Sequence, residues 1–185
     1  YPVNDFTEYL DAVIRPLCEG KHQNFILEMN PIKGYSPLTD ISKLNRIYFN
    51  LLSNAVKFTP EGGTVKLTVK EVMTDETHIR FTIIVSDSGI GISPEFQKHL
   101  FEPFTQENRN DNSKVRGSGL GLAIVKKIVD AMGGSVSVES TEGKGTKFTV
   151  NVTSGCVKNA DLETEDARKE QDADEERMAI SGMRI

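Results

Sequence analysis

The chain has 185 residues, of which 37% are hydrophobic and 26% are charged, and its formal net charge is −5 at pH 7. These values are typical of a soluble globular domain with a core of its own. Every apolar run is shorter than the roughly 18 residues that a membrane helix needs, so we expect no direct membrane contact. No basic stripe with interleaved aromatic residues occurs, which argues against nucleic acid as a partner.

The start of the chain and its cysteines indicate its origin and compartment. No signal pattern is present, and the first residue is Tyr1, from which we expect a fragment of a longer protein. Cys18 and Cys156 belong to no CxxC or Cys/His cluster, so neither a disulfide framework nor a zinc site is indicated. We therefore expect a cytoplasmic location, whether or not the parent protein is anchored in a membrane.

Acidic residues are concentrated at the C-terminal end. Residues 153–185 carry nine Asp and Glu against five Lys and Arg, whereas residues 1–152 carry 18 against 17. The segment NADLETEDARKEQDADEER has one Leu and no aromatic residue, which is too little apolar surface to fold alone. We predict a folded domain over residues 1–152 and an acidic linker or tail over residues 153–185.

In chain order, the apolar periodicity predicts helices that alternate with strands. DFTEYLDAVIRPLC has helical spacing and NFILEMN predicts a short strand, while PIKGYSPLTD has the composition of a turn. Asp40 is the expected N-cap of a helix that ends near Phe58. TVKLTVK, HIRFTIIVSD, GSVSVES and TKFTVNV predict strands, and an amphipathic helix follows Gly121. About five strands and three or four helices predict an α/β fold with helices on one face of one sheet.

The helix that ends near Phe58 contains the stretch IYFNLLSNAVKFT, which is mostly apolar yet holds Asn50, Asn54 and Lys57. At about 100° per residue, Asn50, Asn54 and Lys57 fall within an arc of roughly 60° and face the same neighbour. Two Asn residues one turn apart cost helix stability unless their amides find partners. Carboxamide oxygens can ligate Mg²⁺ and a Lys can neutralise phosphate, so this stripe suits a metal–nucleotide complex. The alternative is a solvated polar face.

Three glycine-bearing segments are the other candidates for binding. In VSDSGIGIS a buried strand ends at Asp87, whose carboxylate can accept a hydrogen bond from an exocyclic amine such as that of adenine. GSGLGL leads into a helix whose free N–H groups suit phosphates. EGKGTKF places Thr146 at the start of the last strand. Taken singly, an Asp-Gly turn, an ordinary helix entry and a hairpin turn explain them as well.

The order and spacing of these segments resemble those of a known family. NLLSNAVKFT, DSGIGI, LFEPF, GSGLGL and GKGT are similar to the N, G1, F, G2 and G3 boxes of sensor histidine kinases, within the GHKL ATPase superfamily. The match spans residues 1–152, and every box is complete. The resemblance implies a two-layer α/β sandwich of the Bergerat type, with a mixed, mainly antiparallel sheet and with helices on one face enclosing ATP and Mg²⁺.

The resemblance also implies which residues contact the nucleotide. Asp87 would bind the adenine amine, Thr146 would support it, and Phe58 would pack on the ring. The loop TQENRNDNSKVRGS would close over the bound nucleotide. The remaining candidate contacts, mostly at the phosphates, are Gly89, Gly91, Ile92, Phe104, Lys114, Arg116, Gly117, Ser118, Gly119, Leu120, Gly121 and Leu122.

At the phosphate end, Asn54 would ligate Mg²⁺, and Asn50 and Lys57 would act as catalytic residues. The chaperone, gyrase and mismatch-repair members of the superfamily carry a Glu one turn before the metal-binding Asn, where it serves as general base. Asn50 occupies that place here and cannot accept a proton near neutral pH. Hydrolysis is thus disfavoured, and transfer of the phosphoryl group to an imidazole on another domain is favoured.

The expected partners follow from the histidines and from the end of the chain. His22, His78 and His99 are followed by Gln, Ile and Leu, so none fits the family's H box, in which an acidic residue follows the histidine. The resemblance therefore implies a histidine-bearing dimerisation domain upstream in the same protein. The final GMRI resembles the opening of a receiver domain, so a response regulator or receiver domain, as in a hybrid kinase, is the second expected partner. A nucleotide-sensing module without transfer activity and a GHKL ATPase stay open as alternatives.

Overall fold

The computed structural model describes residues 3–106 and 119–159. The elements are α1 (Val3–Glu19), β1 (Asn24–Asn30), β2 (Tyr35–Leu38), α2 (Ile41–Phe58), β3 (Thr64–Met73), β4 (His78–Asp87), α3 (Pro94–Gln97), α4 (Gly121–Ala131), β5 (Ser135–Thr141) and β6 (Gly145–Lys158). One or two helices precede each consecutive pair of strands. Among the described residues, no helix has both the length and the apolar character to cross a membrane.

The strands in the described ranges form one six-stranded mixed sheet. The order is β1-β3-β4-β6-β2, and β5 pairs with β6 as well. β1 runs parallel to β3, whereas every other pair is antiparallel. Residues 145–151 of β6 pair with β5, and residues 155–158 pair with β2. The long strand β6 therefore has two neighbours on the same edge. The mixed, mainly antiparallel sheet that we predicted is confirmed.

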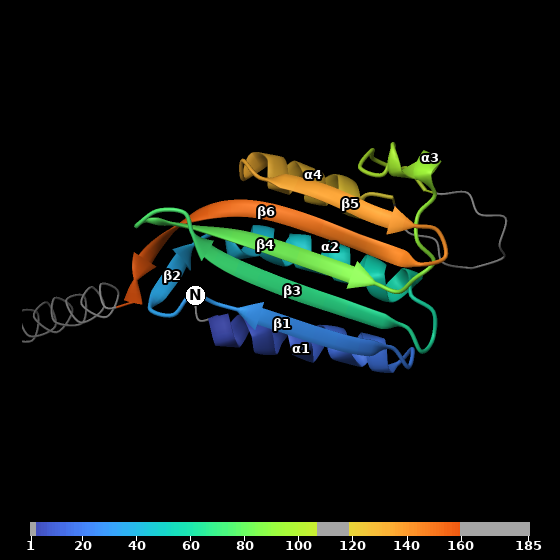
Figure 1. Ribbon diagram of the computed structural model, residues 1–185, viewed down its shortest axis with the longest axis horizontal. Helices are drawn as coiled ribbons and strands as arrows, with labels where there is room; N and C mark the ends of the chain where they lie inside the picture. The colour runs from blue at the N-terminus through green and yellow to red at the C-terminus, as the bar shows by residue number, and fades with distance from the viewer. Residues whose placement is uncertain (1–2, 107–118, 160–185) are drawn as a thin grey trace, which may run out of the picture.

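The helices cover one face of this sheet (Figure 1). Along β3 and β4 the side chains alternate between buried and more exposed positions, so each strand has one apolar face. The buried side chains of β4 are Ile79, Phe81, Ile83 and Val85. They share one core with the buried side of α2, formed by Leu44, Ile47, Tyr48, Leu51, Leu52, Ala55 and Val56. This arrangement is the predicted two-layer sandwich.

The predicted start of α2 is confirmed. The Asp40 carboxylate accepts a hydrogen bond from the Lys43 N–H at 3.2 Å, as an N-cap does. Polar residues Asn50, Asn54 and Lys57 lie outside the buried face of the helix and are only partly exposed. The stripe is therefore neither in the core nor fully in solvent.

Two parts of the sheet differ from the prediction. β2 lies within PIKGYSPLTD, which we predicted to be a turn; Pro37 is tolerated there because β2 is an edge strand. The predicted domain boundary near Thr153 is also wrong, since β6 continues to Lys158. The Ser154 hydroxyl donates to the Leu38 carbonyl oxygen at 2.7 Å and so helps to hold β2 against this extension. Residues 160–185 of the predicted tail lie outside the described residues.

Candidate nucleotide site

The predicted site residues that the structure describes gather at one end of the sheet (Figure 1). β4 and α2 end there, α4 begins there, and β5 turns into β6. The segments that carry these residues are far apart in the sequence, so the fold brings them together. Of the candidate contacts, Lys114, Arg116, Gly117 and Ser118 lie outside the described residues.

The carboxylate of Asp87 is half-buried at the end of β4. Its Oδ1 accepts a hydrogen bond from the Gly89 N–H at 2.8 Å, and the Thr146 N–H donates to the same side chain. Burial raises the pKa of Asp87 above its ordinary value, although both N–H donors act in the opposite direction. The fold thus keeps a hydrogen-bond acceptor in a place where water is partly excluded, which suits recognition of a donor group on a ligand.

The loop after β4 is bonded to the turn between β5 and β6. The Gly143 N–H donates to the Ile90 carbonyl oxygen at 2.8 Å, and the Ile92 N–H donates to the Ser140 hydroxyl at 2.9 Å. Gly91 has a φ of +68°, and a Cβ at this position would lie 2.1 Å from the Thr141 carbonyl oxygen. The DSGIGI and GKGT segments, which the sequence analysis treated separately, therefore form one structural unit.

Thr146 is held by a hydroxyl that we did not predict. Ser140 donates to the Gly145 carbonyl oxygen at 2.9 Å, so the 2.9 Å contact between the two hydroxyls takes its proton from Thr146. Thr146 is 8% exposed, and its orientation beside Asp87 is fixed by this contact. Ser140 could have been found from the sequence. It follows Val136 and Val138 at every second residue of β5, so the three side chains lie on the same, more buried face of the strand.

The last residues of α2 lie against the loop that follows Asp87. The Phe58 carbonyl oxygen accepts a hydrogen bond from the Ile90 N–H at 3.2 Å. Gly89 approaches the same carbonyl so closely that a Cβ would lie 2.5 Å from its oxygen. The Phe58 ring is 40% exposed, and the Lys57 ammonium lies 4.9 Å from its centroid. The helix end that contacts this loop thus carries an aromatic ring and a cation.

Asn50 lies beside the start of α4. Its Nδ2 donates to the Arg46 carbonyl oxygen at 2.7 Å, and a Cβ at Gly121 would lie 2.8 Å from its Oδ1. Leu120, the N-cap residue of α4, makes no side-chain capping hydrogen bond. In the described parts of the chain, no hydrogen bond engages the Asn54 side chain.

Phe104 and Gly119 are joined by their main chains. The Phe104 N–H donates to the Gly119 carbonyl oxygen at 3.0 Å, and both residues have positive φ, +63° and +69°. The Phe104 ring is 74% exposed. Leu122 and Ile92 instead pack against the core. Contact of these four residues with a nucleotide stays a prediction.

A family model matches the part of the chain that contains these segments. The model described as "Histidine kinase-, DNA gyrase B-, and HSP90-like ATPase" matches residues 39–154. The chain belongs to this ATPase family. The match contains the stripe on α2, the loop after β4 and the turn between β5 and β6.

Known members of the ATPase family align with most of the chain. The autoinducer 2 sensor kinase/phosphatase LuxQ of Vibrio parahaemolyticus is 39% identical over 148 residues, which are 80% of this chain and 17% of LuxQ. The sensor histidine kinase RppB of Synechocystis is 43% identical over 151 residues, 81% of this chain and 32% of RppB. The structure of full-length ShkA in complex with AMPPNP superposes with a TM-score of 0.68 at 30% identity, covering 85% of this chain and 31% of ShkA. The chain spans about a third or less of the length of each.

Proposed function

We propose that this chain is the ATP-binding catalytic domain of a two-component sensor histidine kinase. In this role it binds ATP with Mg²⁺ and transfers the γ-phosphoryl group to a histidine on another domain. The observation that carries the proposal is the half-buried Asp87 carboxylate, held by the N–H groups of Gly89 and Thr146. The loop that follows it bonds to the Phe58 carbonyl oxygen. The kinases LuxQ and RppB, and the AMPPNP complex of ShkA, support it by similarity.

At the adenine end, the exocyclic amine of the base donates a hydrogen bond to Asp87. Phe58 packs on the ring, and Gly89 and Gly91 let the backbone approach it. The Thr146 hydroxyl gives its proton to Ser140, so its oxygen is available as an acceptor towards the base or a bound water. A purine with a carbonyl in place of the amine would set an acceptor against Asp87, which gives preference for adenine.

The described residues suit Mg²⁺ that arrives with the nucleotide. They contain no group of three His, Cys, Asp or Glu side chains that could hold a metal ion by themselves. Mg²⁺ commonly takes one or two protein oxygens and completes its shell with phosphates and water. The Asn54 carboxamide, which has no hydrogen bond among the described residues, would supply the protein oxygen. Bound there, the ion would neutralise charge on the phosphates.

At the phosphate end, Lys57 and the start of α4 offer positive charge and N–H donors. We propose contacts with the phosphates from Lys57 and Asn50, and from a group made up of Lys114, Arg116, Gly117, Ser118, Gly119, Leu120, Gly121 and Leu122. Phe104 and Ile92 would border the nucleotide. These assignments extend the resemblance stated above to the residues of this chain.

The reaction requires an acceptor that this chain does not supply. A histidine nitrogen of the dimerisation domain attacks the γ-phosphorus, a nitrogen–phosphorus bond forms, and the bond to the bridging oxygen breaks so that ADP leaves. Asn50 stands where a general base would activate water, and an amide cannot take that proton. The phosphoryl group would then pass to a response regulator or receiver domain. We place this reaction in the cytoplasm.

Binding and transfer test the proposal separately. We expect the 185-residue chain to bind ATP–Mg²⁺ in a calorimetric titration, Asp87→Asn to weaken that binding, and Asn54→Ala to remove its magnesium dependence. With radiolabelled ATP, label should pass to an added histidine-bearing domain of a relative such as RppB. Binding without transfer would indicate a nucleotide-sensing module, and steady phosphate release without an acceptor, lost on Asn54→Ala, would indicate an ATPase.

A further inference from the structure

The C-terminal end of α2 lacks the glycine cap that ends many helices. Thr59, the residue after the helix, has φ −89° and ψ 128°, the extended conformation that a residue before proline favours, and Pro60 follows it. The Thr59 N–H still bonds to the Ala55 carbonyl oxygen at 3.0 Å, but Pro60 has no N–H and the extended chain does not form a Schellman turn over the carbonyl oxygens that follow. Several of those oxygens therefore need donors from elsewhere.

The donors come from the connection between α1 and β1. The Lys21 ammonium donates to the carbonyl oxygens of Val56 at 2.7 Å, Lys57 at 3.1 Å and Thr59 at 3.0 Å. The Gln23 amide donates to Val56 at 3.0 Å and to Thr59 at 2.6 Å. Because both of its partners are carbonyl oxygens, the Gln23 amide must present its nitrogen to them. Its own oxygen is buried without a hydrogen-bond partner among the described residues.

The chemistry of Lys21 and Gln23 suits this place. A positive charge at a helix C-terminus interacts favourably with the helix dipole, and hydrogen bonds from an ammonium are stronger than neutral ones. Gln23 is 6% exposed, so its two bonds are shielded from water. The unpaired oxygen of Gln23 is a cost that an apolar residue would avoid, which indicates that donation to α2 is what this side chain does.

The same helix end is also bonded to the loop that follows Asp87. There the Ile90 N–H donates to the Phe58 carbonyl oxygen, and Gly89 packs against that carbonyl. The turn of helix that carries Lys57 and Phe58 is thus bonded to two segments. One is the loop of the nucleotide site, and the other is the α1–β1 connection.

We propose that Lys21 and Gln23 are positioning residues of the nucleotide site. They fix the last turn of α2, and so they set the Phe58 ring and the Lys57 ammonium in the orientation that binds ATP. This inference rests on the proposed function and adds to it two residues that do not contact the nucleotide. It makes the α1–β1 connection a structural support of the site.

Titration of the 185-residue chain with a fluorescent ATP carrying its label on the ribose, in the presence of Mg²⁺, tests the inference. Lys21→Met removes all three hydrogen bonds but keeps the aliphatic stem, and we expect it to weaken binding about tenfold. Lys21→Arg keeps charge and donors and should recover most of the affinity. Lys33→Met, at an exposed lysine of the β1–β2 loop, is the matched control and should bind as the wild type does.

A double-mutant cycle with Phe58→Ala separates positioning from a general loss of stability. If Lys21 acts through the last turn of α2, Lys21→Met should weaken binding less in the Phe58→Ala background than in the wild type, because the part that acts through the ring is gone. An undiminished cost in that background, or binding by Lys21→Met within about twofold of wild type, would overturn the inference. Thermal unfolding checks that each variant is folded; should Lys21→Met not fold, Gln23→Met takes its place. No binding by the wild type would instead refute the proposed function.

Discussion

The ionised carboxylate of Asp87 lowers the stability of the folded state, because the side chain is half-buried. Burial raises its pKa above 3.8, against the effect of the two N–H groups that donate to it. A carboxyl group whose pKa is higher in the folded than in the unfolded state binds its proton more readily when folded. Its contribution to stability is therefore fully present below the unfolded pKa and is lost as the pH rises through the folded value.

We expect Asp87→Asn to remove this part of the pH dependence of stability. As the pH rises above 3.8, the wild type should lose stability relative to the variant, because only the wild type must ionise a half-buried group. Urea unfolding at a series of pH values measures the difference. The control is Glu8→Gln, at an exposed residue of α1; its free energy of unfolding should differ from that of the wild type by the same amount at every pH. A difference between wild type and Asp87→Asn that is constant across the series would contradict the explanation by burial.

Among the glycines that the structure describes, Gly145 leaves the least room for a Cβ. Its φ is +115°, and a Cβ there would lie 2.0 Å from the Asp87 carbonyl oxygen. We expect Gly145→Ala to lower the free energy of unfolding by about 2–4 kcal/mol, because strain and a clash with backbone add together. Gly143→Ala is the matched control in the same turn, with φ +78° and no atom within 4 Å, and should cost about 1 kcal/mol. Denaturant unfolding measures both costs. If the two variants lost the same free energy of unfolding, the positive φ alone, and not the contact with the Asp87 carbonyl oxygen, would explain the loss.

Among the elements, those with a clear local period were predicted and those made by distant partners were not. α2 and β4 carry unbroken periods of apolar residues, and the structure confirms both. β2 was missed because it has four residues with Pro37 among them, and its pairing exists only where β6 passes. The extension of β6 was missed for the converse reason, since Ser154 and Gly155 resemble a turn until β2 is placed beside them.

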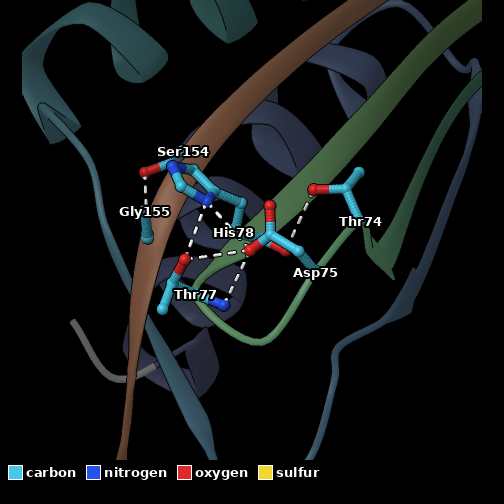
Figure 2. A network of polar contacts seen from close by, with 6 residues as sticks. All are labelled: Thr74, Asp75, Thr77, His78, Ser154 and Gly155. Carbon is cyan, nitrogen blue, oxygen red and sulfur yellow. Dashed lines mark hydrogen bonds and ion pairs between the residues drawn. The ribbon is translucent and has the colours of Figure 1, made fainter.

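The turn between β3 and β4 holds a polar network at the opposite end of β4 from Asp87 (Figure 2). Asp75 Oδ1 accepts hydrogen bonds from the Thr77 N–H at 2.8 Å and the Thr77 hydroxyl at 2.9 Å, and His78 Nδ1 lies 2.9 Å from it. These partners lower the pKa of Asp75 from 3.8 to about 2, the Thr77 N–H having the largest effect. The network therefore depends on the ionised carboxylate.

A depressed pKa gives this turn a pH dependence opposite to that of Asp87. The contribution of Asp75 is present above its unfolded pKa of 3.8 and is lost as the pH falls towards about 2. We expect Asp75→Asn to reduce the loss of stability over that range, as followed by circular dichroism during acid titration. Glu76→Gln, at an exposed neighbour in the same turn, should leave the acid transition in place. If both variants shifted the transition equally, net charge rather than the network would be responsible.

At the scale of the whole molecule, the sequence predicted which segments form the candidate site but not how they contact one another. The order of the glycine-bearing segments and the polar stripe on α2 was enough to assign Asp87 and Asn50 to one site. Two contacts hold these segments together: the Gly143 N–H bonds to the Ile90 carbonyl oxygen, and Lys21 bonds to the end of α2. Both join residues that are far apart in the chain. Neither contact has a local pattern, because each depends on the sheet order that brings its partners together.

The two-layer architecture itself predicts a contrast between two neighbouring isoleucines on β4. Ile83 is fully buried under the helices, whereas Ile84 points to the other face of the sheet and is only partly covered. Ile83→Ala should lower the free energy of unfolding by about 3–4 kcal/mol, since it leaves a cavity in the core, and Ile84→Ala by about 1 kcal/mol or less. Urea unfolding of the two variants measures both costs with the same change of side chain. Equal costs would mean that the second face of the sheet is also covered in solution, which a sandwich with helices on one face alone does not allow.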